Sequence, residues 1–332
     1  MTLPSTMSAI ALSGHGGPEV MRLQQLPLPV PAPGDVLIRV AAASVNAPDL
    51  SQRAGHYPPP PGASPLLGLD VAGEIVHPAG QWREGNRVVA LCNGGGYAEY
   101  VAVPAGQVLP IPAGWSWTEA AALPECWFTV TQTLVMRAGL ASGMFVLVSG
   151  ASGGVGGAAI SIAKILGAIP LAIVSSDDKE AYVRHLGATD TIRRDRDDIV
   201  ARTLAMTGDR GADRVLDLAG GEFTGFAVEA SARFGHIVVV STLADRNATL
   251  PLNKITAKQL TLSGSTLRPQ TAETKAAIAT TLRDRIWPAL ADPAFPRPQI
   301  RTFSPEDAAA AHIAMQNPSH FGKIVLVTAF GR

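Results

Sequence analysis

The residues with the clearest chemistry form a glycine-rich turn between an apolar run and a helix-like stretch. Residues 146–156 read VLVSGASGGVG, so Gly150, Gly153 and Gly156 recur at every third position. Small residues let the backbone approach a pyrophosphate, and N–H groups at the start of a helix bind its charge. A second apolar run at 171–174 completes the strand–helix–strand context of a dinucleotide site. The turn predicts nucleotide binding; the plainer alternative is a tight turn that only packs a helix against a strand.

The segment after the second apolar run bears on which nicotinamide nucleotide is bound. It reads SSDDK from 175 to 179. An acidic residue here favours a free ribose hydroxyl, and a basic one favours a 2′-phosphate. Two hydroxyls and Lys179 could hold a phosphate, whereas Asp177 or Asp178 could instead cap the helix that follows. The arginines at 193 and 194 add positive charge, unless they form only a solvated surface run with the aspartates at 195–198.

Other chemistries find little support. None of the seven histidines forms an HxxxH or HExxH pair, and Cys92 and Cys126 lie far from CxxC spacing. No GxSxG nucleophile elbow occurs, and Ser152, within the glycine turn, is better suited to hydrogen-bond a phosphate or cofactor. A hydride-transfer enzyme needs no nucleophile, because the cofactor carries the chemistry. We expect no metal ion, although a zinc site assembled from distant residues stays open.

Two kinds of element must position these residues. Short apolar runs separated by Gly and Pro predict an all-β unit before residue 120, with strands at 36–40, 73–76, 87–91 and 97–101. A long helix is expected over 118–140. Strands then alternate with helices, which predicts a parallel sheet. The expected strands are 145–148, 171–174, 214–218 and 236–240, and the expected helices are 155–166 and 179–186. A helix at 305–316 and a strand at 323–327 close the chain.

Composition limits the class of protein. The 332 residues fit two domains, and 47% hydrophobic residues supply a sizeable core. The 27 Lys and Arg balance the 27 Asp and Glu, which argues against a general nucleic-acid or anionic-membrane binder. Two cysteines rule out a disulfide framework. No apolar run is long enough to span a membrane, and residues 1–17 lack the basic start of a secretory signal. We expect a cytoplasmic protein.

The chain combines the segments 16–20, 43–49, 67–73, 95–100 and 321–325 with the glycine turn. Together they resemble the zinc-free quinone oxidoreductases of the medium-chain dehydrogenase/reductase superfamily, from about residue 7 to residue 328. Residues 55–64 and 264–268 are most similar to the tumour-suppressor-inducible subgroup. Zinc-dependent relatives have a Cys ligand at the position of Asn46 and Gly-His-Glu at 68–70, and they carry a four-cysteine lobe that is absent here.

The resemblance implies an α/β protein with a GroES-like β-barrel catalytic domain, residues 1–122 and 268–332, and a Rossmann NADPH-binding domain, residues 123–267. Asn46 would face the nicotinamide or substrate, and Tyr57 the substrate mouth; these are the candidate catalytic residues. Lys179 matches a lysine that holds the 2′-phosphate. The expected cofactor-binding residues are Asn46, Thr129, Gly150, Ser152, Gly153, Gly154, Val155, Ser176, Lys179 and Arg194.

Each role has a structural alternative. Asn46 could bond only a loop backbone, and Tyr57 could pack in its proline-rich loop. Thr129 could bond back to a helix carbonyl, and Lys179 could be a solvated first-turn residue. Three positions depart from the family pattern: Ser175 replaces a common Gly, Arg194 replaces a Tyr, and Ser51 replaces a Tyr near the pocket.

The resemblance implies an NADPH-dependent quinone oxidoreductase whose partner is a small quinone or activated alkene. One alternative is a 2-alkenal or enoyl reductase of the same fold. Another is a non-catalytic NADPH-binding sensor or structural protein. No nucleic-acid or membrane partner is expected. Relatives dimerise through Rossmann edge strands, so a homodimer is expected, with residues 259–263 as the edge strand.

Overall fold

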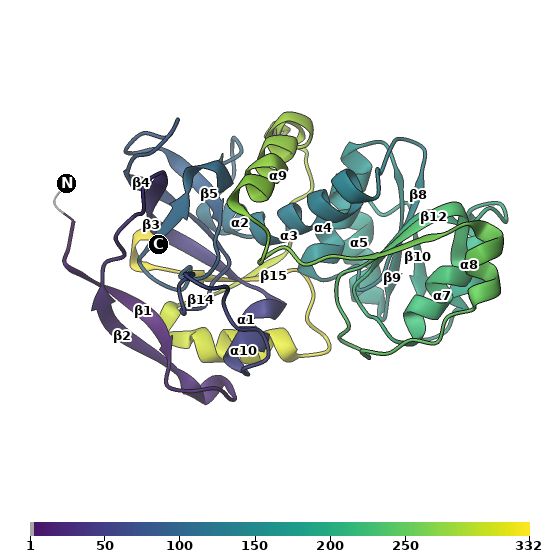
Figure 1. Cartoon of the computed structure of the whole chain (residues 1–332), viewed down its shortest axis with the longest axis horizontal. Coiled ribbons are helices and arrows are strands. Elements are labelled where there is room, and N and C mark those ends of the chain that lie inside the picture. The colour runs from purple at the N-terminus through teal and green to yellow at the C-terminus, as the bar shows by residue number, and fades with distance from the viewer. Residues whose placement is uncertain (1–2) are drawn as a thin grey trace. The chain divides into compact units, whose positions relative to one another are not determined.

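The structure, a computed structural model, describes residues 3–332, and the chain divides into two compact units (Figure 1). The first unit contains the residues up to 128 and residues 268–332, and the second contains residues 129–267. The first boundary lies later than the expected one after residue 122. The reason is that helix α3 (Pro124–Val130) begins within the first unit, where Trp127 packs edge-to-face on Trp287.

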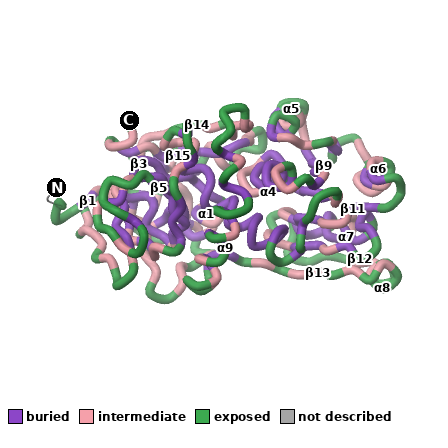
Figure 2. The backbone as a smooth tube through the Cα atoms, turned by 90° about the horizontal axis from the view of Figure 1, so that it is seen from above, coloured by how far each residue is buried: buried purple, intermediate pink, exposed green. Residues whose placement is uncertain are grey.

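The first unit is built on a largely antiparallel seven-stranded sheet in the order β14-β15-β3-β4-β5-β7, with β6 also paired to β3. Val36, Ile38 and Val71 of this sheet are fully buried. In Figure 2 the tube is largely purple, the colour of buried residues, near the labels of β3 and β15. The strands are β3 (Asp35–Val45), β4 (Asp70–His77), β5 (Arg87–Leu91), β6 (Tyr100–Pro104), β7 (Val108–Pro110), β14 (Ile300–Phe303) and β15 (Lys323–Val327). Also present are the hairpin β1 (Thr6–Leu12) and β2 (Met21–Pro27), and the helices α1 (Ala47–Arg53), α2 (Trp117–Ala121), α9 (Ala272–Arg285) and α10 (Ala308–Gln316).

Strand register in this sheet brings three polar residues to one end. Strand β15 runs antiparallel to β3 with Ile324 opposite Val45, and β4 runs antiparallel to β3 with Val71 opposite Ala43. Lys323 and Asp70 therefore begin their strands beside the point where β3 ends, at Asn46. Residues far apart in sequence meet here because of strand pairing alone.

The second unit is a parallel six-stranded sheet in the order β10-β9-β8-β11-β12-β13, which confirms the α/β expectation. All five strand pairs are parallel. The strands are β8 (Phe145–Val148), β9 (Ile169–Val174), β10 (Asp190–Arg193), β11 (Ala212–Asp217), β12 (Ser231–Val239) and β13 (Thr261–Gly264). The helices are α4 (Gly154–Ile165), α5 (Asp177–His185), α6 (Ile199–Met206), α7 (Glu222–Ala230) and α8 (Leu252–Lys258).

Three expected elements differ in the structure. The helix expected over 305–316 begins as a 3-10 turn, Pro305–Asp307, and is α-helical only in α10. The single helix expected over 118–140 is wrong: the chain forms α2, α3 and a π-helical segment, η3 (Thr131–Arg137). Pro124 starts a new helix because proline disfavours helical backbone in the residue before it. The strand expected at 97–101 begins instead at Tyr100, after a turn in which Gly95 adopts a positive φ of 90°.

Candidate functional site

The glycine turn lies where the strand order of the second unit reverses. Strand β8 pairs with β9 on one side and with β11 on the other, and the chain visits β9 and β10 before crossing to β11. In open parallel sheets, ligands bind at this reversal, outside the carboxyl ends of the strands. The turn that follows Val148 is therefore placed for ligand binding by the topology itself.

Each of the three glycines has a different structural role in the turn. Gly150 has a φ of +57°, which side-chain-bearing residues rarely adopt. Gly153 is the N-cap of α4. Gly156 has no room for a side chain, since an added Cβ would lie 2.3 Å from the carbonyl oxygen of Gly150. The N–H groups of Gly154 and Val155 start the helix and have no intrahelical acceptor. This cradle of backbone donors fits a pyrophosphate, with Ser152 buried beside it.

The residues expected near the adenosine ribose gather at the same sheet edge. Ser176 caps α5, with its hydroxyl accepting the N–H of Lys179 at 3.3 Å, so the alternative of an aspartate cap is wrong. Lys179 Nζ donates to Ser175 Oγ at 3.3 Å. Arg194 N donates to Val174 O, and its side chain is exposed. Burial, and then the charge of Arg194, lower the pKa of Lys179.

Arg193 has a purely structural position. Its side chain is only 9% exposed and pairs with Asp195 at 2.9 Å and with Asp177. It is thus not part of a solvated run, and it pairs with Asp177, at the start of the helix that carries Lys179. Thr129 is buried in α3, where the hydroxyl of Thr133, not its own, donates back to the Thr129 carbonyl at 2.7 Å.

Asn46 lies in a buried cluster at the end of β3, here called the Lys323 network: Ser44, Asn46, Asp70, Glu125, Cys126 and Lys323. Lys323 Nζ donates to Asn46 Oδ1 at 2.6 Å. Asn46 Nδ2 donates to Asp70 Oδ1 at 3.0 Å, and Ser44 Oγ donates to the same oxygen at 2.7 Å. The side-chain amide of Asn46 therefore forms hydrogen bonds with the side chains of Lys323 and Asp70, and not only with a loop backbone. Its contact with a cofactor stays a prediction.

The other end of the Lys323 network is the start of α3. Lys323 Nζ donates to Cys126 Sγ at 3.6 Å, and the Cys126 thiol donates to Glu125 Oε2 at 3.5 Å. The Glu125 N–H donates to Asp70 Oδ2 at 3.2 Å. Burial raises the pKa of Cys126 well above its ordinary value. Burial likewise raises the pKa of Glu125 to about 7, although Lys323 opposes this.

A second chain of hydrogen bonds fixes the start of α1. Asp49 accepts the N–H of Asn46 at 2.9 Å, the N–H of Gly68 at 2.9 Å and the hydroxyl of Tyr97 at 3.3 Å. Burial raises the pKa of Asp49 to about 6 despite these donors. Beyond Tyr97, the hydroxyl lies 3.2 Å from Nε2 of His312.

The tautomer of His312 follows from its neighbours. Nδ1 lies 3.1 Å from Arg53 Nη1, and a guanidinium can only donate. Nδ1 therefore accepts, and Nε2 carries the hydrogen and donates to Tyr97. Burial, with a smaller contribution from Arg53, lowers the pKa of His312 to about 3.

A pH-dependent stability is expected from this neutral imidazole. Between about pH 6.5 and pH 3 the unfolded chain binds a proton at His312 that the folded chain does not, so stability is lost as pH falls through this window. The slope approaches about 1.4 kcal/mol per pH unit. Urea unfolding of wild type and His312→Gln from pH 7 to pH 4 measures it. Asp49 and Glu125, with raised pKa values, act with the opposite sign in both proteins, so the difference between the two slopes gives the contribution of His312. An unchanged slope in that variant would contradict the assignment.

Tyr57, the other candidate catalytic residue, is half-buried beside Arg268. The guanidinium of Arg268 lies 5.5 Å from the centre of its ring. Burial raises the pKa of Tyr57; Arg268 opposes this, and Glu125 adds to it. Arg268 donates to the carbonyl of Asn93 at 2.6 Å, and Lys275 Nζ donates to Asn93 Oδ1 at 2.5 Å. Tyr57 thus borders a polar site rather than packing only within its loop.

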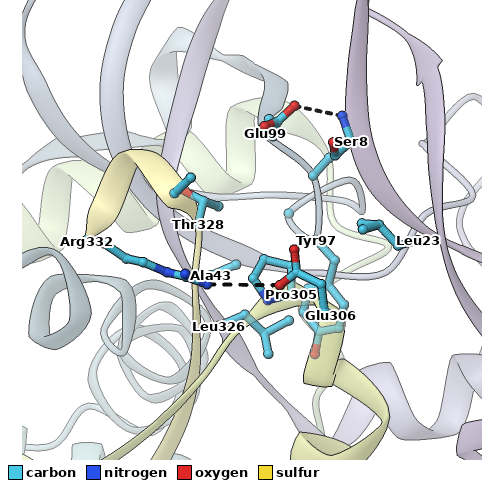
Figure 3. Close-up of a pocket in the computed structure, with 13 residues that line it drawn as sticks. Ser8, Leu23, Ala43, Tyr97, Glu99, Pro305, Glu306, Leu326, Thr328 and Arg332 are labelled. Atoms are coloured by element: carbon cyan, nitrogen blue, oxygen red, sulfur yellow. Dashed lines mark hydrogen bonds and ion pairs between the residues drawn. The ribbon is translucent and has the colours of Figure 1, made fainter.

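A separate cavity of about 120 Å³ lies under the β1–β2 hairpin (Figure 3). Its charged groups are engaged: Glu99 accepts the N–H of Ser8 at 2.7 Å, and Glu306 pairs with Arg332 at 4.0 Å. Ligand sites for small molecules usually measure a few hundred Å³ or more. This cavity is therefore too small for a dinucleotide.

The Lys323 network is a poor site for zinc. An ammonium group lies within hydrogen-bonding distance of both Asn46 Oδ1 and Cys126 Sγ, where it would repel a metal ion. Across residues 3–332, no group of three or more His, Cys, Asp or Glu side chains is arranged to hold a metal. In the same part of the chain, no helix is both long and apolar enough to cross a membrane.

Sequence reasoning missed the roles of Asp70, Glu125, Cys126 and Lys323. Asp70 and Lys323 stand in matched motifs, but the sequence gives no sign that they contact Asn46. That contact depends on the registers of β4 and β15 against β3. The available signal was the lysine at 323, which begins an apolar run expected to form a buried strand.

Comparisons with known proteins cover both units. The family model described as "Alcohol dehydrogenase GroES-like domain" matches residues 32–113. The model described as "Zinc-binding dehydrogenase" matches residues 154–283. The chain is 31% identical to quinone oxidoreductase of Sus scrofa over 71% of this chain and 73% of that protein. It is 32% identical to quinone oxidoreductase of Mus musculus over 70% and 73%, respectively.

Solved structures agree over nearly the whole chain. A quinone oxidoreductase of Pseudomonas syringae is 26% identical, with a TM-score of 0.80 over 97% of this chain and 99% of that one. An NAD-dependent alcohol dehydrogenase is 30% identical, with a TM-score of 0.81 over the same shares. The CurK enoyl reductase, 24% identical, has a TM-score of 0.83 and shares the fold.

Proposed function

This chain belongs to the quinone oxidoreductase branch of the medium-chain dehydrogenase/reductase superfamily and is an oxidoreductase of the nicotinamide-dependent kind, and we propose that it transfers hydride from NADPH to a quinone without a metal ion. The glycine cradle is the observation that carries the proposal. The nicotinamide, when bound, supplies the hydride. The N–H groups of Gly154 and Val155 would bind the pyrophosphate, with Gly150, Ser152 and Gly153 shaping the turn.

Charge at the adenosine end favours NADPH over NADH. Lys179 and Arg194 leave two positive charges at the ends of β9 and β10. One acidic group of the same helix turn, Asp177, is paired with Arg193. A 2′-phosphate would meet cations there, together with the hydroxyls of Ser175 and Ser176, and charge-assisted hydrogen bonds are the strong ones. Thr129 is proposed to contact the nicotinamide half.

The Lys179→Glu variant tests the cofactor choice. We expect its Kd for NADPH to rise ten- to a hundredfold, since a charged hydrogen bond worth about 1.5–3 kcal/mol is lost and a repulsion is added. The Kd for NADH should change less than threefold. Fluorescence titration measures both, and Lys254→Glu, at an exposed lysine of α8, is the charge-matched control. Equal weakening of both nucleotides would contradict the role of Lys179.

In the catalytic unit, Tyr57 would bind the substrate at its mouth, beside Arg268. Asn46, held by Lys323 and Asp70, would present a fixed surface to the nicotinamide or substrate. The expected substrate is a small quinone or activated alkene; no nucleic acid or membrane partner is proposed. The two buried, free cysteines suit the reducing cytoplasm.

A homodimer is proposed on the topology of the second unit. Strand β13 (Thr261–Gly264) is an edge of the six-stranded sheet, and among the strands of residues 3–332 it pairs with β12 alone. It begins two residues after the expected start at 259, because Gln259 caps α8 with a positive φ of 54°. A second copy could extend the sheet through this edge, and sedimentation would measure the mass.

A further inference from the structure

We propose that Glu125 is the proton donor of the reaction. This inference rests on the proposed function, which requires one proton for each hydride. Hydride addition to a quinone or an activated alkene leaves an anion, the hydroquinone monoanion or an enolate. The O–H bond of the Glu125 carboxyl breaks, an O–H or C–H bond forms on that anion, and the Glu125 carboxylate then takes a proton from water. The reduced nicotinamide supplies both electrons.

Hydrogen-bond donors distinguish the three buried acids of this region. Asp70 accepts from Ser44, Asn46 and the N–H of Glu125, and Asp49 accepts from the N–H groups of Asn46 and Gly68 and from Tyr97. Three donors stabilise the ionised form of each. By contrast, within residues 3–332 the one donor that reaches the Glu125 carboxyl is the weak thiol of Cys126, at 3.5 Å. Glu125 is therefore the acid best suited to keep its proton.

The charges facing Glu125 support the same assignment. Lys323 on β15 favours its ionisation, but this ammonium donates to Asn46 and Cys126. Asp70 on β4 and Asp49 on α1 oppose ionisation, as does burial itself, which is the largest cause of the raised pKa of about 7. Tyr57 faces it from the loop after α1. A donor pKa near the working pH is the most effective for general acid catalysis.

Exposure separates Glu125 from the other acids. Asp49 and Asp70 are 0% exposed, whereas Glu125, although buried, keeps 8% exposure as a residue. It lies at the first turn of α3, near the Tyr57 ring whose pKa it influences. Glu125 is thus a member of the Lys323 network whose charge acts on Tyr57, at the proposed substrate mouth.

Infrared titration of the cofactor-free protein tests the proton directly. We expect a protonated-carboxyl stretch that disappears with a midpoint near pH 7 and is absent from Glu125→Gln. The Asp49→Asn variant should retain it, which separates it from the Asp49 titration near pH 6. A spectrum in which Glu125→Gln keeps the band, or in which it has vanished by pH 5, overturns the proposal. This readout does not depend on any activity.

The kinetic test uses NADPH and a quinone. Wild-type kcat should fall as pH rises through about 7, since the donor is lost by ionisation. In Glu125→Gln, kcat should be at least a hundredfold lower and flat across that range, with the Kd for NADPH unchanged. Glu125→Asp should recover part of kcat with a shifted profile, and it serves if Glu125→Gln does not fold. Glu306→Gln, an exposed site, is the control.

Two results would separate the possible failures. An active enzyme whose kcat is unchanged in Glu125→Gln but falls at least a hundredfold in Tyr57→Phe assigns the proton to Tyr57 and overturns the present proposal. A wild type that reduces no acceptor, yet shows the Glu125 carboxyl band, rejects the proposed function and leaves the protonation of Glu125 standing.

Discussion

Gly156→Val is expected to abolish binding of the nicotinamide nucleotide and to destabilise the fold by about 3 kcal/mol. An added Cβ would lie 2.3 Å from the carbonyl oxygen of Gly150 and 2.6 Å from Cα of Ala151. These are backbone atoms, so α4 must move away from β8 and carry the N–H groups of Gly154 and Val155 with it. Fluorescence titration with NADPH and urea unfolding measure the two effects.

Gly153→Ala is the matched control in the same turn. Gly153 has an ordinary extended backbone with φ of −80°, and an added Cβ would lie 3.5 Å from its nearest neighbour. The cost should stay within about 1 kcal/mol, the usual loss for alanine at a helix N-cap. If Gly156→Val binds NADPH as well as Gly153→Ala does, the cradle does not hold the pyrophosphate.

Lys323→Met should destabilise the protein by about 3–5 kcal/mol, because it leaves buried acids without their cation. Lys323 is 5% exposed and lowers the pKa of both Asp70 and Glu125. Without it, both acids titrate at higher pH in the folded state than in the unfolded chain. The variant should therefore lose more stability at pH 8 than at pH 5, as urea unfolding at the two pH values would measure.

Two variants control this experiment. Lys254→Met, at an exposed lysine, should change stability by less than about 0.5 kcal/mol. Adding Glu125→Gln to Lys323→Met should recover part of the loss at pH 8, since one of the unpaired acids is removed. A Lys323→Met protein as stable as wild type at both pH values would show that the ammonium does not balance these acids.

The sequence predicts local structure well where a single strand or turn is determined by its own residues. The runs 87–91, 145–148 and 323–327 are strands with those bounds, and the glycine turn opens α4 as expected. The helix expected over 118–140 failed because its alanine-rich pattern hides the break at Pro124. Helix propensity summed over a window of residues does not reveal that one proline ends one helix and starts the next.

The site could be predicted only in part, for a physical reason. Ser176 and Lys179 lie within one turn of helix, so their spacing alone brings them together. Asn46 and Lys323 lie 277 residues apart in the chain and meet only through the register of β15 on β3. Motifs identify such residues one by one, whereas their hydrogen bonds and shifted pKa values follow from burial, which a linear pattern does not contain.

The most direct test of the proposed function is the loss of reduced-nicotinamide absorbance with NADPH and with NADH, each against ortho- and para-quinones and a panel of enals. We predict fast oxidation of NADPH by a quinone, with kcat/KM for NADH at least tenfold lower, as expected when a charged contact to the 2′-phosphate is missing. A higher kcat/KM for enals than for any quinone would identify an alkenal reductase. Tight NADPH binding with no acceptor reduced would contradict an enzymatic role altogether.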